Sequence, residues 1–220
     1  MHSMIGRRSN LLARIVRLVG ILLALLAPGA AQQVQVKLDP ATTHIDWTLG
    51  DVLHTVQGTF QLKSGTIVFD QKTGEASGQI VVDATSGNSG NGTRDSKMKK
   101  EILETARYPD IVFVPRHVSG FVPGQEAFTI QVAGNFTVHG STHDLTLTLP
   151  IVVKNTALEA NTKFEVPYVD WGMKNPSTLF LKVDKSVQIS IAAAETCSRL
   201  QNSRNTPAVL IPRSGAPIRF

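Results

Sequence analysis

Residues 128–149 read FTIQVAGNFTVHGSTHDLTLTL, and this stretch decides the fold. Its apolar side chains fall on alternate positions in two runs: Phe128, Ile130, Val132, Phe136 and Val138, then Leu145, Leu147 and Leu149. Because strand side chains point to opposite faces in turn, the pattern predicts two β-strands with one apolar and one polar face. The segment between them, residues 139–142, contains Gly140, which can take the positive φ of a tight hairpin turn.

The same alternation recurs over most of the chain and predicts a series of strands, joined mainly by short turns. The expected strands are residues 44–49, 56–62, 66–70, 79–84, 111–114, 128–138, 145–153, 162–171, 179–183 and 187–193. Residues 32–43 are expected to be a lead-in to the first strand. Because the edges of so long a sheet invite aggregation, an all-β fold closed into a barrel is favoured.

The strand pattern breaks once, at a glycine-rich loop over residues 86–92 that is followed by a predicted helix over residues 93–107. Thr93 can cap the start of this helix, and Asp95 suits its positive end. Pro109 ends it. Helical spacing places a single apolar stripe on one side, formed by Met98, Ile102, Leu103 and Ala106.

The first 31 residues have the pattern of a secretory signal peptide. Arginines come first, an apolar run follows over residues 18–27, and small residues precede Gln32. We therefore expect cleavage after Ala31 and a periplasmic or secreted location. The alternative is an uncleaved membrane anchor, but the apolar run is short for a membrane span.

The net charge of +5 arises from the two ends of the chain. Residues 1–31 and 196–220 each hold four arginines and no acidic residue, which leaves 14 basic against 17 acidic residues between them. A nucleic-acid partner is therefore not expected, since it needs basic residues on the folded surface. Residues 32–195 are expected to form one domain and residues 196–220 a disordered basic tail. The single cysteine, Cys197, lies in this tail and excludes an internal disulfide.

The candidates for catalysis or metal binding are histidines: His44, His54, His117, His139 and His143. None belongs to an HExxH or similar motif, and there is no GxSxG sequence. Their positions suit turns and surface sites, so neither a metal site, a cofactor nor a catalytic residue is predicted. A metal-dependent enzyme remains the less favoured alternative.

Several short motifs occur in a fixed order over residues 38–193. They are GTF at residues 58–60, GTIVFD at 65–70, VVDA at 81–84, RD at 94–95, YPDIVF at 108–113, GNFTVHG at 134–140 and DWGM at 170–173. Together they resemble the YceI-like family of lipid-binding proteins. The resemblance implies a lipocalin-like, extended antiparallel β-barrel of about eight strands with one short helix. It also implies a ligand, either a polyprenyl chain or an isoprenoid quinone.

An apolar barrel interior can hold such a chain by burial alone, at roughly 25 cal/mol per Å². The predicted ligand-binding residues are the inward side chains Phe60, Phe69, Ile80, Val82, Ile130, Val132, Phe136, Leu145, Leu147 and Ile189. The hypothesis is a non-catalytic envelope carrier of an isoprenoid lipid that makes transient contact with a membrane. The alternative is an interaction or stress-related module whose barrel is filled by side chains. The sequence leaves the oligomeric state open, with a dimer among the choices.

Overall fold

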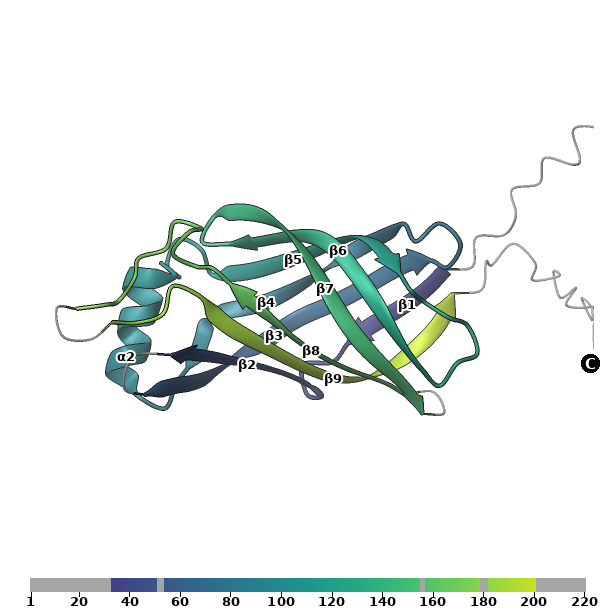
Figure 1. The fold of residues 1–220 in the computed structure, drawn as a ribbon, viewed down its shortest axis with the longest axis horizontal. Helices are drawn as coiled ribbons and strands as arrows, with labels where there is room; N and C mark the ends of the chain where they lie inside the picture. The colour runs from purple at the N-terminus through teal and green to yellow at the C-terminus, as the bar shows by residue number, and fades with distance from the viewer. Residues whose placement is uncertain (1–32, 51–53, 155–156, 179–181, 201–220) are drawn as a thin grey trace, which may run out of the picture. The chain divides into compact units, whose positions relative to one another are not determined.

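The computed structural model describes residues 33–50, 54–154, 157–178 and 182–200. Its elements follow in the order β1 (Gln33–Leu38), β2 (Thr43–Gly50), β3 (Thr55–Asp70), β4 (Ala76–Asn88), α2 (Gly92–Lys97), η1 (Met98–Ile102), β5 (Asp110–Ser119), β6 (Ala127–Val138), β7 (Ser141–Lys154), β8 (Ala157–Val166) and β9 (Val187–Leu200) (Figure 1). The expected signal peptide and residues 201–220 of the expected tail lie outside the described residues.

The strands form one antiparallel sheet that closes on itself. Neighbouring strands follow the order β1-β3-β2-β9-β8-β7-β6-β5-β4, and pairing of β4 with β3 completes a barrel of eight strands plus β1. The short helix packs at one end (Figure 1). The predicted all-β, lipocalin-like barrel with one short helix is therefore confirmed.

β1 and β2 occupy the same position in the barrel, one after the other. Both are antiparallel to β3 on one side and to β9 on the other. β1 pairs with the second half of β3, and β2 pairs with its first half. The expected lead-in over residues 32–43 was thus wrong, because Gln33–Leu38 is a strand. Between the two strands the chain turns at residues 39–42, where Thr43 N donates to Asp39 O at 3.0 Å.

β3 is one strand where the sequence predicted two, over residues 56–62 and 66–70. Leu62 and Phe69 are both buried although they differ in parity. The pairing with β4 shifts between Leu62 and Ser64, which is a β-bulge. Because a bulge adds one residue to a strand, it returns the apolar side chains to the inner face without ending the strand.

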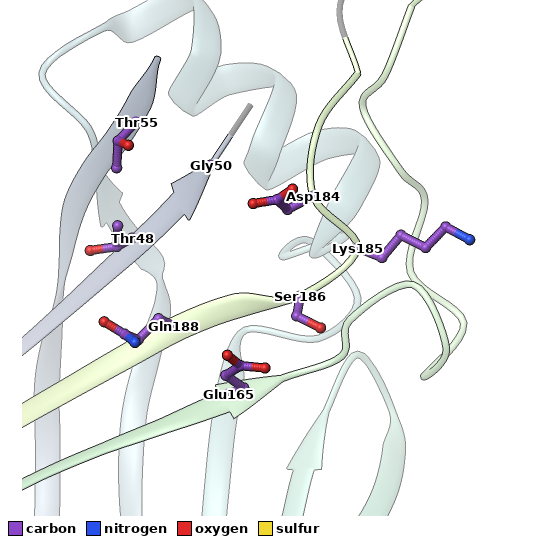
Figure 2. A pocket seen from close by; sticks show the side chains of 8 residues that line it. All are labelled: Thr48, Gly50, Thr55, Glu165, Asp184, Lys185, Ser186 and Gln188. Carbon is purple, nitrogen blue, oxygen red and sulfur yellow. The ribbon is translucent and has the colours of Figure 1, made fainter. Parts of the chain in front are cut away.

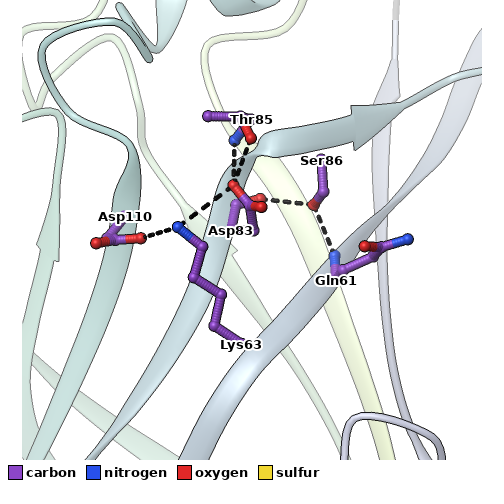
Figure 3. Close-up of polar contacts among 6 residues, drawn as sticks. All are labelled: Gln61, Lys63, Asp83, Thr85, Ser86 and Asp110. Atoms are coloured by element: carbon purple, nitrogen blue, oxygen red, sulfur yellow. Dashed lines mark hydrogen bonds and ion pairs between the residues drawn. The ribbon is translucent and has the colours of Figure 1, made fainter.

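A polar cluster joins the strands at the seam between β3 and β4, where the ladder is interrupted (Figure 3). Gln61 N donates to Ser86 Oγ at 2.8 Å, and Ser86 Oγ donates to Asp83 O at 2.6 Å. Lys63 Nζ lies between the carboxylates of Asp83 and Asp110. Partial burial of Asp83 opposes its ionisation, but hydrogen bonds from Thr85 and the Lys63 charge lower its pKa overall. Side chains thus replace the missing ladder bonds.

The hairpin of β6 and β7 is paired without a shift from Ala127–Val152 to Val138–Ser141. Its turn has only two residues, His139 at φ 50° and Gly140 at φ 75°. Two successive positive φ values belong to a type I′ turn, whose twist matches that of the strands. The predicted role of Gly140 is confirmed, and the turn is tighter than the four residues expected.

Gly140→Ala is expected to lower the free energy of unfolding by about 2–4 kcal/mol, since a left-handed conformation and a tight contact act together. A Cβ at this position would lie 2.4 Å from Tyr108 Cε1. Gly124→Ala is the matched control, because Gly124 has φ 81° and open space around it. Urea unfolding of both variants measures the difference. Equal losses in the two variants would show that the Tyr108 contact contributes nothing.

The helix is shorter than the predicted residues 93–107. α2 continues as a π-helical turn, η1, that ends at Ile102. Its cap is Asn91, whose side chain accepts from Arg94 N, and not Thr93. Glu104 takes φ 47°, which stops the helix well before Pro109. No helix among the described residues is both long and apolar enough to cross a membrane.

The C-terminal part of the sheet also differs from the prediction. β8 ends at Val166, and the residues up to 171 turn, with Trp171 N donating to Pro167 O at 3.1 Å. The expected strand over residues 179–183 lies partly outside the described residues, and Val183 makes only an isolated bridge. β9 runs to Leu200, beyond the expected domain boundary at residue 195, and Cys197 pairs with Val36 of β1.

Apolar side chains gather in two clusters on the inner face of the barrel. The β1-side cluster consists of the buried residues Val34, Phe69, Phe113, Val118, Val132 and Leu147. The helix-side cluster consists of the buried residues Ile102, Val138, Val166, Tyr168 and Met173. Phe136 and Phe164 pack against both clusters and connect them. The stripe of Met98, Ile102 and Leu103 was predicted correctly as packing, whereas Ala106 is exposed.

Candidate functional site

The structure brings most of the predicted ligand-binding residues together on the inner face. Phe69, Val132 and Leu147 are buried members of the β1-side cluster. Ile80, Ile130, Phe136 and Leu145 are partly buried against that cluster, and Ile189 is partly buried against the helix-side cluster. Phe60 and Val82 belong to neither cluster. Phe60 instead points towards Gly87, where a Cβ would lie 2.7 Å from its ring.

Several inward side chains are only partly buried. Ile130, Phe136, Leu145, Leu149 and Phe164 keep accessible surface although cross-strand pairing places them on the inner side. Accessible surface on an inward residue means that water-sized space lies beside it, since surface in full contact is not accessible. The interior is therefore packed in places and open in others.

Aromatic rings line the helix end of the interior. The Phe136 ring lies 6.3 Å from Phe164 and 5.8 Å from Trp171, measured between centroids. His143 stacks on Trp171 at 4.0 Å with the two rings 5° from parallel. Such stacked and edge-on contacts are the favoured arrangements of aromatic groups.

The sequence reasoning missed His143 as part of this group, because it treated all the histidines as turn or surface residues. β7 begins at Ser141, so His143 shares parity with Leu145 and Leu147 and lies on the inner face. That parity is the signal in the sequence that could have found it. His139, in contrast, lies in the hairpin turn as expected, with Nε2 3.3 Å from Glu104 Oε1 but outside hydrogen-bond geometry.

Phe121 closes off the β1-side cluster. It lies in the loop between β5 and β6, with its ring edge-on to Phe69 at 5.4 Å and to Phe128 at 5.5 Å. Two exposed large apolar residues lie at this end: Val122 in the same loop and Val152 near the end of β7. One end of the interior is thus covered by a loop and the other by the helix and the turn after β8.

A polar groove of about 450 Å³ lies outside the barrel near the helix end (Figure 2). Its lining residues are Thr48, Gly50, Thr55, Glu165, Asp184, Lys185, Ser186 and Gln188. Thr48, Gln188 and Glu165 form a row across three adjacent strands on the outer face. This groove offers hydroxyl, amide and charged groups, so it does not suit an apolar chain.

A second groove, of about 510 Å³, lies beside the break between β1 and β2. It is lined by Pro40, Ala41, Thr43, His44, Ile45, Asp46, Thr59, Phe60, Gln61 and Leu62. Of the predicted ligand-binding residues, Phe60 alone lines this groove. The groove combines the buried Ile45 and Leu62 with polar side chains, so it is amphipathic rather than purely apolar.

The histidines that the structure describes do not gather into a metal site. His44, His54 and His117 are exposed on separate strands or loops. Within the described part of the chain, no three His, Cys, Asp or Glu side chains are placed to hold a metal ion together. The candidate functional site is therefore the apolar interior of the barrel with its aromatic group.

The fold is shared with solved bacterial proteins. BcnA from Burkholderia cenocepacia aligns with a TM-score of 0.58 at 17% identity, covering 72% of this chain and 99% of BcnA. A polyisoprenoid binding domain from Saccharophagus degradans, described as implicated in plant cell wall breakdown, aligns with a TM-score of 0.55 at 16% identity, covering 74% and 98%.

Comparison with curated proteins found no match. The model of the YceI-like domain matches residues 36–194, which span β1 to most of β9. This match covers all of the barrel except the start of β1 and the end of β9, and it includes both grooves and the aromatic end of the interior. The chain therefore belongs to the YceI-like domain family.

Proposed function

We propose that this protein binds an isoprenoid-type lipid along the inner face of its barrel and carries it in the cell envelope without catalysis. The observation that carries the proposal is the continuous apolar inner face, with Phe136 and Phe164 joining its two clusters. Burying a long prenyl chain there is favourable at roughly 25 cal/mol per Å² of apolar surface. A compact polar metabolite would leave its polar groups unpaired.

The fold relationship supports the same ligand class. A structural neighbour from Saccharophagus degradans is described as a polyisoprenoid binding domain. The inner face of the present barrel has the chemistry that such a ligand requires. The ligand is thus a polyprenyl chain or an isoprenoid quinone, held mainly by contact with aliphatic and aromatic side chains.

Export and membrane contact are part of the proposal. The pattern of residues 1–31 supports cleavage near Ala31 and a periplasmic or secreted carrier. Gln33 pairs with Leu200, so the chain enters and leaves the barrel at one end. Residues 201–220 hold three arginines and no acidic residue, and each basic residue near an anionic membrane contributes about 1 kcal/mol. These features support transient contact of that end with a membrane.

Native mass spectrometry of the exported protein tests the proposal. After incubation with squalene, a prenyl hydrocarbon, the protein should carry one added squalene mass that organic solvent removes. The same measurement on freshly purified protein should show an extractable prenyl lipid. Protein that emerges without lipid and takes up no squalene would favour the alternative, an interaction module whose barrel is filled by side chains.

A further inference from the structure

The loop between β5 and β6 carries an apolar tip between two glycines. Residues 120–124 read GFVPG and contain no charged side chain. Gly120 has φ 80° and Gly124 has φ 81°, a conformation that favours glycine. Val122 and Pro123 are exposed. The GFVPG loop therefore presents apolar surface to solvent at the end of the barrel where Phe121 covers the interior.

Two neighbouring residues of this loop have opposite environments. The Phe121 ring lies edge-on to Phe69 at 5.4 Å and to Phe128 at 5.5 Å, and it packs against the β1-side cluster. Val122 is 38% exposed. Movement of the loop away from the barrel would thus carry Phe121 off the interior and leave Val122 at the tip.

The helix end of the interior is closed by a hydrogen-bonded network. Met173 N donates to Tyr168 O at 3.0 Å, and the Tyr168 hydroxyl donates to Asp184 O at 2.7 Å. Tyr168 and Met173 are each 4% exposed. Lys174 Nζ lies 2.9 Å from Glu101 Oε2, which ties the same segment to η1. Opening this end would break these bonds and expose buried side chains, so it is costly.

Phe121 closes the other end by ring contacts. Within the loop, the bond from Gln125 N to Val122 O is long, at 3.4 Å. A shorter bond of 2.7 Å follows the loop, from Val153 N to Glu126 O. Outward movement of Phe121 would break ring contacts and leave that shorter bond intact. The β1-side end is therefore the easier end to open.

The C-terminal end of β9 lies close to the GFVPG loop. Phe69, which contacts Phe121, pairs with Val34, and Val34 pairs with Arg199 on its other side. The backbone of Arg199 is therefore two strand spacings, about 10 Å, from that of Phe69. Residues 201–220 follow directly and hold three arginines and no acidic residue. A chain spans up to about 3.5 Å per residue, so these arginines can reach a surface that touches the loop.

The barrel surface around the loop is not itself basic. The turn between β3 and β4 lies beside β5, because Glu75 forms a bridge with His117. This turn places Lys72 and Glu75 near the loop, and Glu126 follows the tip; all three are exposed. Attraction of this end to an anionic surface therefore depends on the arginines of residues 201–220.

We propose that the GFVPG loop docks on an anionic lipid bilayer with Val122 inserted, and that Phe121 is the movable cover past which the isoprenoid chain moves between bilayer and interior. The inference rests on the proposed function. An apolar tip gains free energy by burial among lipid chains, and a basic segment beside it is attracted to anionic headgroups. Together they give reversible binding at the end of the barrel that is easier to open.

Sedimentation of the exported protein with lipid vesicles tests the docking surface. Wild-type protein should bind vesicles of phosphatidylglycerol and phosphatidylethanolamine, and should bind phosphatidylcholine vesicles at least about tenfold more weakly. Val122→Asp should weaken binding to the anionic vesicles about tenfold, because a charge of the lipids' own sign replaces inserted apolar surface. Val114→Asp is the matched control and should leave binding unchanged. Val114 is 39% exposed but lies on the outer face of β5, opposite Asn135.

Three results of this measurement would overturn the docking assignment. They are no binding of wild-type protein to the anionic vesicles, equal binding to both kinds of vesicle, and equal losses in Val122→Asp and Val114→Asp. Circular dichroism verifies that both variants are folded. The vesicles contain no isoprenoid, so the result does not depend on the proposed function.

Transfer of squalene between the protein and the anionic vesicles tests the role of Phe121. The rate for wild-type protein should rise with vesicle concentration, because the lipid moves during contact. Phe121→Ala should speed both loading and unloading about fivefold, which corresponds to about 1 kcal/mol of lost ring contact. Reduced affinity alone would not speed both directions. Trp171→Ala is the matched control and should change neither rate, since Trp171 is a half-buried ring at the helix end, 5.8 Å from Phe136 and 4.0 Å from His143.

The outcomes separate this inference from the proposed function. If squalene binds but Trp171→Ala speeds transfer as much as Phe121→Ala, or Phe121→Ala does not speed it, the cover is wrong while the carrier stands. A transfer rate independent of vesicle concentration would also overturn the inference. If wild-type protein takes up no squalene, the proposed function falls, and the role of Phe121 falls with it.

Discussion

Val132→Asp is expected to lower the free energy of unfolding by about 3–5 kcal/mol, the usual effect of an uncompensated buried charge. Val132 is 4% exposed and packs with Phe113, Val118 and Leu147 in the β1-side cluster. A carboxylate at this position would be withdrawn from bulk water among apolar side chains. Because most small domains are stable by only about 5–15 kcal/mol, a loss of this size removes much of the stability.

Thr146→Asp is the matched control for that substitution. Thr146 lies on β7, in register with Ala133 on the outer face, and is exposed. The same new charge there should change the free energy of unfolding by no more than about 0.5 kcal/mol. Urea unfolding followed by circular dichroism compares the two variants. Similar losses in both would contradict the assignment of inner and outer faces on which the fold and the site depend.

The hairpin of β6 and β7 was predictable from the sequence because its alternation is unbroken. Every second residue from Phe128 to Val138 is apolar or Gly134, and the observed register keeps these side chains on one face. Period-two alternation is a property of a single strand, so it can be recognised in the sequence without knowing the partner strand. The closed barrel followed from the repetition of this pattern along the chain.

The elements that were missed depend on contacts between distant parts of the chain. β1 is only a short alternating run, and its pairing with β3 and β9 makes it a strand. The two runs within β3 look separate in the sequence because a bulge near Lys63 changes their parity. The helix ends early at Glu104, whose left-handed conformation has no sequence signal comparable to that of a glycine.

The site was predictable only in outline. Parity identified inward residues, but it could not tell buried Val132 from partly accessible Leu145, since that difference depends on packing across the barrel. Trp171 reaches the aromatic group from a turn after β8, in a segment that was expected to be a strand. The place of His143 in this aromatic group therefore required the three-dimensional arrangement.

Val132→Asp does not measure ligand binding, because any loss of affinity would follow from the loss of folding stability. Leu145 is the better position for that purpose. It lies on the inner face opposite Gly134 and is partly accessible, so a larger side chain there extends into the interior. Leu145→Trp would therefore fill part of the interior, whereas Leu145→Ala would enlarge it. Thr146→Trp places the same indole ring on the outer face and is the control.

The binding of squalene to Leu145→Trp protein tests most directly whether the barrel interior holds a prenyl chain. A tryptophan that excludes at least about two methylene groups of the chain, at about 0.8 kcal/mol each, should weaken binding more than tenfold. Thr146→Trp should bind squalene as well as the wild type, and Leu145→Ala, which removes contacts but blocks no space, should lose less affinity than Leu145→Trp. Circular dichroism verifies that each variant is folded. Equal squalene affinity in folded Leu145→Trp and wild-type protein would contradict the account, because the lipid would then bind outside the interior.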